Sequence, residues 1–198
     1  MPYFRKKHIL FIHIPKAGGT TVHKRFLLDD TVELHNDQMN HNKILPYPFN
    51  KISLQHQFFN TIYHYRDLLN ITFDNQIKII ASVRNPYTRI VSDLFYQKLI
   101  TDETTKLQVY EVIKKYVVAD NYDNHNDPQY KFVIDEKGEK LIPNLIVFKT
   151  ETLNEDLLSI GFLTTRYFNK GKSADVDYME YLNEDSIRLI NIIYARDF

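Results

Sequence analysis

The sequence predicts an α/β protein, a three-layer sandwich with a central and mainly parallel sheet. Three apolar runs, at residues 8–14, 77–83 and 145–149, have the length and near-continuous apolar character of strands buried on both faces. Each run is followed by a segment with helical periodicity, and this alternation favours parallel strands joined by helices. The 198 residues, 43% of them hydrophobic, suffice for one core, so we expect a single domain over residues 1–198.

The other elements follow from periodicity and from helix and turn signals. Pro15 ends the first strand, and Gly18-Gly19 turns the chain into the first helix. Asn85 is the expected N-cap, and Pro86 the first residue, of the helix after the second strand. Helices are predicted over residues 20–28, 53–69, 86–100, 104–118, 153–159 and 183–195. Irregular segments are predicted over 29–51 and 120–128, and a hairpin pairs 130–134 with 140–142.

The composition excludes several classes of function. Lysine and arginine total 25, as do aspartate and glutamate, so nothing favours general binding to nucleic acid or to an acidic membrane. Any anion site must therefore be local. The absence of cysteine excludes disulfides, thiol nucleophiles and cysteine-ligated metals. The apolar run at residues 8–14 is too short to span a bilayer, so we expect a soluble, cytoplasmic protein without an integral membrane segment.

Residues 13–21, HIPKAGGTT, join the first strand to the first helix and favour anion binding. Glycines let backbone amides point inward, and a helix start adds unpaired N–H groups and partial positive charge. Lys16 adds a full charge, and Thr20 and Thr21 add hydroxyl donors. A Walker A loop has Gly-Lys-Ser/Thr, whereas here the lysine precedes the glycines. An ordinary glycine-rich turn is the alternative reading of this segment alone.

Residues 82–96, SVRNPYTRIVSDLFY, form a second candidate anion site. Arg84 ends the second strand, and Ser92 lies about two turns into the next helix, so the two can hold one phosphate from two sides. Thr88, Arg89, Ser92 and Tyr96 recur at helical spacing and predict one polar stripe. A structural salt bridge of Arg84 is the alternative reading.

With both motifs in view, the chain resembles the Golgi-type and bacterial carbohydrate sulfotransferases, which have a P-loop-like fold. HIPKAGGTT is similar to their 5′-phosphosulfate loop, and VRNPYTRIVS to their 3′-phosphate motif, in the family's order. Residues 127–157 and 193–198 resemble later parts of the family more weakly. The resemblance implies that 3′-phosphoadenosine 5′-phosphosulfate is the donor, that no metal is needed, and that a hydroxyl, in this family often on a glycan, is the acceptor.

The resemblance also implies roles for residues of the donor site. The 5′-phosphosulfate is expected on Lys16, Ala17, Gly18, Gly19, Thr20 and Thr21, and the 3′-phosphate on Arg84 and Ser92. Lys170, Gly171 and Lys172, in residues 169–173 (NKGKS), are expected to close over the 3′-phosphate side, with a solvated turn as the alternative. The family often has Arg-Phe-Glu after its third strand, and this chain departs from that pattern around Glu151.

The acceptor hydroxyl requires a base, and histidine is the usual base near neutral pH. In the resembling family a histidine or glutamate between the two motifs often has this role, which makes His56 our first candidate. His64, two turns later on the predicted helix, is its rival, and His125 is a further candidate. His13 lies within the first predicted strand and is expected to be a core residue. We therefore expect His56 and Lys16 to be catalytic, with no metal ligand.

Two other functional classes are compatible with parts of the sequence. A P-loop kinase or other nucleotide phosphotransferase would share the fold and the glycine loop, but it should also carry Gly-Lys-Ser/Thr and an acidic magnesium ligand after a buried strand. Here the second and third strands end in Val83-Arg84 and Phe148-Lys149. A non-catalytic binder of anionic nucleotides or glycans would keep Arg84 and need no base.

Overall fold

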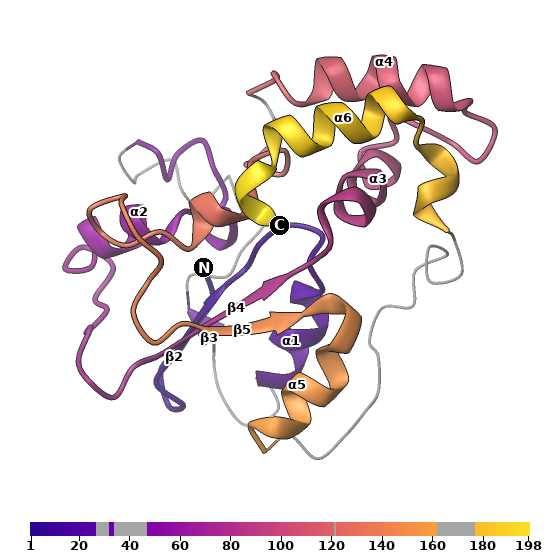
Figure 1. The fold of residues 1–198 in the computed structure, drawn as a ribbon. Coiled ribbons are helices and arrows are strands. Elements are labelled where there is room, and N and C mark those ends of the chain that lie inside the picture. Colours follow the sequence, from indigo (N-terminus) through magenta and orange to yellow (C-terminus); the bar gives the residue numbers. More distant parts are fainter. Residues whose placement is uncertain (27–31, 34–46, 121, 162–176) are drawn as a thin grey trace.

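The computed structural model describes residues 1–26, 32–33, 47–120, 122–161 and 177–198. Over these residues, the strands form a five-stranded sheet with the order β3-β1-β2-β4-β5 (Figure 1). The strands are β1 (Tyr3–Phe4), β2 (Ile9–Ile12), β3 (Val32–Glu33), β4 (Lys78–Val83) and β5 (Ile146–Lys149). β2, β4 and β5 are parallel, whereas β1 is antiparallel to β2 and β3. The predicted α/β class with a mainly parallel sheet is confirmed; β1 and β3, of two residues each, are too short for a sequence period.

Both faces of the sheet are buried at β2 and β4, as their apolar sequences predict, whereas the edge strand β5 leaves Val147 46% exposed, so the prediction of a strand buried on both faces is wrong there. Alternate side chains of one strand face opposite ways, so Phe11 and Ile80 pack on one face while Leu10 and Ile79 pack on the other. The helices α1 (Gly19–Phe26) and α5 (Leu153–Ser159) cover the first face. The second face is covered by α2 (Phe59–His64) and the 3₁₀ segment Gln129–Phe132.

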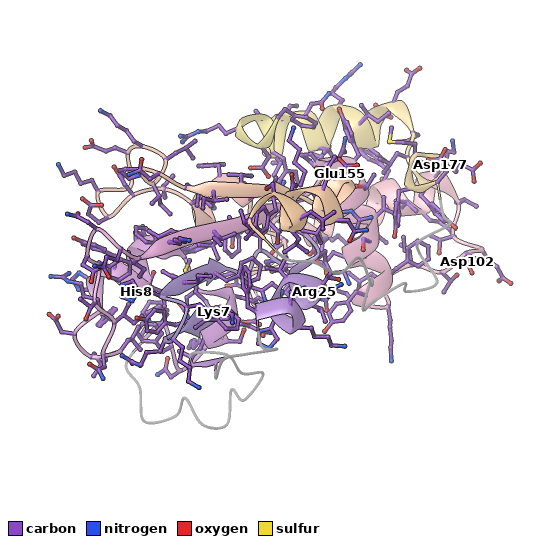
Figure 2. The ribbon with its side chains drawn as sticks, turned by 90° about the horizontal axis from the view of Figure 1, so that it is seen from below. Lys7, His8, Arg25, Asp102, Glu155 and Asp177 are labelled. Atoms are coloured by element: carbon purple, nitrogen blue, oxygen red, sulfur yellow. The ribbon has the colours of Figure 1, made fainter. Side chains whose placement is uncertain are left out.

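A third group of helices packs beyond the carboxyl ends of the parallel strands. It contains α3 (Pro86–Tyr96), α4 (Lys106–Tyr116) and α6 (Glu184–Ile193), with a core that includes Leu94, Ile113 and Ile190. Figure 2 shows His8, at the start of β2, at one end of the molecule and Asp102 at the other, beside this group. Ligand sites of parallel α/β sheets lie at these carboxyl ends, so this edge is the place to look for chemistry.

The predicted helix boundaries hold where capping residues set them. Asn85 caps α3 by accepting a hydrogen bond from the amide of Tyr87, and Pro86 opens the helix. Thr105 and Gln108 form a capping box at the start of α4. Among the described helices, none has the length and apolar character that crossing a bilayer requires.

Two local predictions are wrong. Residues 53–69 do not form one helix: a 3₁₀ turn covers Leu54–His56, and α2 begins only after Gln57 and Phe58, which have extended backbones. His56 and His64 therefore do not share a helix face. The predicted hairpin is reduced to a single bridge between Ile134 and Leu141, because a 3₁₀ helix replaces most of its first strand.

Candidate active site

The segment after β2 forms an open nest of backbone amides at the start of α1. Lys16 and Gly18 have left-handed backbones, with φ of 62° and 78°, which turn the chain sharply before the helix. Within the described part of the chain, the amides of Gly18, Gly19 and Thr20 donate no hydrogen bond. Unpaired amides at a helix start attract an anion, so the predicted loop has the geometry of a phosphate or sulfate site.

The glycines are required by packing around this loop. A Cβ on Gly19 would lie 2.1 Å from Cδ2 and 2.2 Å from Nε2 of His13, so glycine lets this imidazole close over the helix start. A Cβ on Gly18 would lie 3.0 Å from Leu153 of α5. Ala17 is fully buried, Thr21 is buried, and Thr20 is exposed. His13 therefore lies just past β2, against the loop, rather than inside a strand as predicted.

Arg84 connects the second motif to this loop. Its Nη1 donates to the carbonyl oxygen of Lys16 at 3.4 Å, and its Nε donates to Thr88 Oγ1 at 3.0 Å. Ser92 follows Thr88 by one turn on the same side of α3 and is 7% exposed, and its hydroxyl makes no hydrogen bond with the described residues. The Arg84 guanidinium thus lies between the glycine loop and the side of α3 that carries Thr88 and Ser92.

The backbone of Arg84 is held by a residue that the sequence analysis missed. The side chain of Gln129 accepts from the Arg84 amide at 2.9 Å and donates to the Arg84 carbonyl at 2.8 Å. Asp197 in turn accepts hydrogen bonds from the amides of Gln129 and Tyr130. No motif in the sequence indicates this connection, because its members are 45 and 68 residues apart.

Arg89 does not belong to the predicted polar stripe. It is only 4% exposed and donates to the backbone carbonyls of Pro15, His125 and Asp127, at 3.0, 2.7 and 3.0 Å. A buried guanidinium needs several acceptors, and its five donors allow it to bridge separate segments. Arg89 therefore ties the loop that carries Lys16 to the loop that carries His125.

Lys16 points its ammonium at an aromatic ring of α3. Its Nζ lies 4.2 Å from the centroid of the Tyr96 ring, a cation–π contact. Burial lowers the pKa of Lys16, Asp93 raises it and the charge of Arg84 lowers it further. Tyr96 also stacks on His125, with ring centroids 5.5 Å apart and planes within 6°. The Tyr96 ring thus contacts both the glycine loop, through Lys16, and the loop that carries His125.

His56 forms a buried carboxylate–histidine pair. Its Nδ1 lies 2.7 Å from Oδ2 of Asp123, and the same carboxylate accepts from the amide and hydroxyl of Ser53, each at 2.6 Å. Burial lowers the pKa of His56, whereas the hydrogen bond that it donates to Asp123 raises it. Burial would raise the pKa of Asp123, but the bonds from His56 and Ser53 outweigh it and lower that pKa. The pair is thus a neutral imidazole held by an ionised carboxylate.

His56 is also the central member of a cluster of three histidines. The ring of His56 makes edge contacts with His13 and His125, at centroid distances of 5.3 and 4.8 Å. Among the described residues, His56, Asp123 and His125 each place one possible ligand atom within 4.8 Å of the others. A carboxylate at Nδ1 orients a histidine base and a histidine metal ligand alike, so these contacts by themselves assign no metal to the cluster, and metal-free transfer stays a prediction.

The remaining candidates lie elsewhere. His64 is exposed at the end of α2, makes an edge contact with Tyr65 and lines the groove described below. Glu151 accepts a hydrogen bond from the amide of Asn85 at 2.9 Å, which links the ends of β4 and β5. The predicted donor contacts Lys170, Gly171 and Lys172 lie outside the described residues.

An open groove of about 1410 Å³ lies beside the histidine cluster. Its described walls come from residues 47–65, from residues 117–131 and from the end of α6. Aromatic rings such as Tyr65 and Tyr130 alternate with amides such as Asn60 and Asn124, and Asp123 forms part of the wall. Rings and amides of this kind bind sugars well, because they offer flat apolar faces beside donors and acceptors.

The fold and the geometry at this edge define an α/β protein with a site suited to an anion. Its glycine loop faces a helix start, an arginine from the neighbouring strand joins it, and a carboxylate-held histidine lies close by. The family model described as "Sulfotransferase family" matches residues 3–198, so the chain belongs to the sulfotransferase family, whose reaction is the transfer of a sulfuryl group. No curated protein and no solved structure gave a significant match.

Proposed function

We propose that the chain transfers a sulfuryl group from 3′-phosphoadenosine 5′-phosphosulfate to a hydroxyl of a carbohydrate acceptor. The observation that carries this proposal is the hydrogen bond from Arg84 to the Lys16 carbonyl, which joins two anion motifs 68 residues apart into one site. A donor with phosphates at both ends of its nucleoside needs two such centres. The free amides of Gly18 to Thr20 suit the 5′ side, and Arg84 with Ser92 suits the 3′ side.

The chemistry asks little of the protein beyond positioning and charge stabilisation. The acceptor oxygen forms a new bond to sulfur while the bond between sulfur and the bridging oxygen of the 5′-phosphate breaks. Lys16 stabilises the charge that grows on the leaving phosphate. Burial and the Arg84 charge, which lower its pKa, also bring this ammonium closer to donating its proton.

His56 has the surroundings of a general base. Asp123 faces Nδ1, so the lone pair of the neutral ring lies on Nε2, where it can accept the proton of the acceptor hydroxyl. The carboxylate then stabilises the imidazolium that results, as in other carboxylate–histidine pairs. His64 lacks a carboxylate partner among the described residues and is exposed, which favours His56 as the base.

A carbohydrate acceptor is supported by the groove beside Asp123. This groove is large enough for several sugar rings, and it combines exposed aromatic faces with side-chain amides. Its wall includes the carboxylate that holds His56, so an acceptor bound there lies near the proposed base. A kinase is disfavoured because Arg84 and Thr150, rather than an acidic magnesium ligand, directly follow β4 and β5.

The proposal is tested by single-turnover transfer of labelled sulfate from the donor to a panel of oligosaccharides. His56→Ala should lower the transfer rate by roughly 100-fold or more, the usual range for a lost general base, and should leave donor affinity unchanged. His64→Ala is the matched control: although His64 lines the groove, this variant should retain the wild-type rate at saturating acceptor. The lowered pKa of His56 keeps its imidazole neutral in mild acid. The wild-type rate should therefore fall only at a pH below the ordinary pKa of histidine.

Three results would contradict parts of this assignment. Loss of activity in His64→Ala but not in His56→Ala would move the base to α2. Loss of activity after treatment with EDTA, restored by a divalent metal, would contradict metal-free transfer. Normal binding of 3′-phosphoadenosine 5′-phosphate without transfer to any hydroxyl would favour a non-catalytic binder.

A further inference from the structure

A second carboxylate–histidine pair lies next to the first and has no role in the chemistry described so far. His125 Nδ1 is 2.8 Å from Oδ1 of Asp93, and both side chains are buried, with 9% and 2% of their surfaces exposed. The hydroxyl of Tyr116 donates to the other oxygen of Asp93. Burial would raise the pKa of Asp93, but the bonds from His125 and Tyr116 outweigh it and lower that pKa. Asp93 is therefore ionised, and it fixes the orientation of the His125 ring.

The His125 ring is clamped between the donor loop and the proposed base. It stacks in parallel on Tyr96, over which Lys16 lies, and meets His56 nearly at right angles, with planes at 86° and centroids 4.8 Å apart. Its own backbone carbonyl accepts a 2.7 Å hydrogen bond from the buried Arg89. A ring held at its edge, at its face and at its backbone cannot rotate freely, so it forms a rigid wall for His56.

We propose that His125, held by Asp93, is a positioning residue that fixes the plane of the His56 ring. This inference rests on the proposed function, because it assigns a partner to the proposed base. With Asp123 at Nδ1 and His125 against the ring, His56 can direct Nε2 in only one way. A base must hold this direction at the moment the acceptor oxygen attacks sulfur.

The groups around His56 also influence its pKa, which gives the positioning role a measurable readout. Burial is the largest influence and lowers the pKa of His56. Asp123 raises that pKa, whereas charges on His125 and on the ammonium group of Met1 lower it. His13 contacts the ring from the end of β2 at 5.3 Å. Removing His125 therefore takes away one influence that keeps His56 neutral, and the pKa of His56 should rise.

The variant His125→Asn separates these effects from simple loss of structure. The asparagine Nδ2 can take the place of imidazole Nδ1 and keep the hydrogen bond to Asp93, but it has no ring and no charge beside His56. We expect kcat to fall roughly 10- to 100-fold, as for a misplaced catalytic group. The affinity for 3′-phosphoadenosine 5′-phosphate, measured by calorimetry, should stay the same. The acid limb of the kcat/KM profile should move to higher pH.

The control is Tyr116→Phe, which removes the other hydrogen bond to Asp93 and leaves the His125 ring in place. Its acid limb should coincide with that of the wild type. His125→Gln gives a second test if His125→Asn folds poorly, and thermal unfolding reports this. The Gln variant removes the same ring and charge, so its acid limb should shift in the same direction.

Two outcomes would overturn the inference without touching the proposed function. An unchanged acid limb in both His125 variants, with kcat lowered alike at every pH, would mean that His125 only supports the fold. Complete loss of activity at every pH in a His125 variant that folds and still binds 3′-phosphoadenosine 5′-phosphate would mean that His125 is itself the base. A wild-type protein that binds 3′-phosphoadenosine 5′-phosphate yet transfers no sulfate would instead refute the proposed function, and this inference with it.

Discussion

The most direct test of the donor site is the replacement of Arg84 by alanine. In the structure, Arg84 directly follows β4, and its guanidinium donates to Thr88 and to the carbonyl oxygen of Lys16. If it binds the 3′-phosphate, its removal deletes at least one charge-assisted hydrogen bond, worth about 1.5 to 3 kcal/mol, which corresponds to a loss of affinity of roughly 10- to 150-fold. The 3.4 Å bond to Lys16 is long, so the glycine loop itself should change little.

Two ligands in the same calorimeter separate the two halves of the site. 3′-Phosphoadenosine 5′-phosphate should lose the full factor in Arg84→Ala, whereas adenosine 5′-monophosphate, which lacks the 3′-phosphate, should bind as it does to the wild type. Arg84→Lys keeps the charge without the planar fork, so its affinity for the bisphosphate should be intermediate. Equal losses for both ligands would show that Arg84 supports the loop instead, and the assignment of the 3′-phosphate would be wrong.

Two further predictions concern the glycine loop and the acceptor. Gly19→Ala should destabilise the fold by about 1 to 3 kcal/mol in denaturant unfolding, because the new Cβ would lie 2.1 Å from His13. The same variant should lower turnover, because a displaced His13 would disturb its contact with His56. Adding His13→Ala should restore the stability; a double variant as unstable as the single one would point to another cause. The described lining of the groove has four carboxylates and two lysines, so it should repel a negatively charged acceptor. Uncharged oligosaccharides should therefore show a higher kcat/KM than polyanionic ones. The opposite order would refute this charge argument.

The sequence predicted the fold well where the physics is local. The strands around residues 9–12, 78–83 and 146–149 are apolar on both faces, and such runs have few alternatives to a central parallel sheet. Asn85 and Pro86 set the start of α3 through a hydrogen bond and a fixed backbone angle that involve only neighbouring residues. The break after the 3₁₀ turn Leu54–His56 was missed, because apolar spacing alone does not mark two extended residues.

By itself, the sequence determined where the two proposed anion motifs lie along the chain. Residue type and spacing were sufficient to predict the glycine loop at a helix start and the arginine at a strand end. Only the tertiary structure decided which histidine has a carboxylate partner, because Asp123 lies 67 residues from His56 and pairs with it only after the chain has folded. The inward turn of Arg89 and the bond between Asp93 and His125 were decided in the same way. Buried polar groups must find partners wherever the packed chain supplies them, and no local pattern records which partners those are.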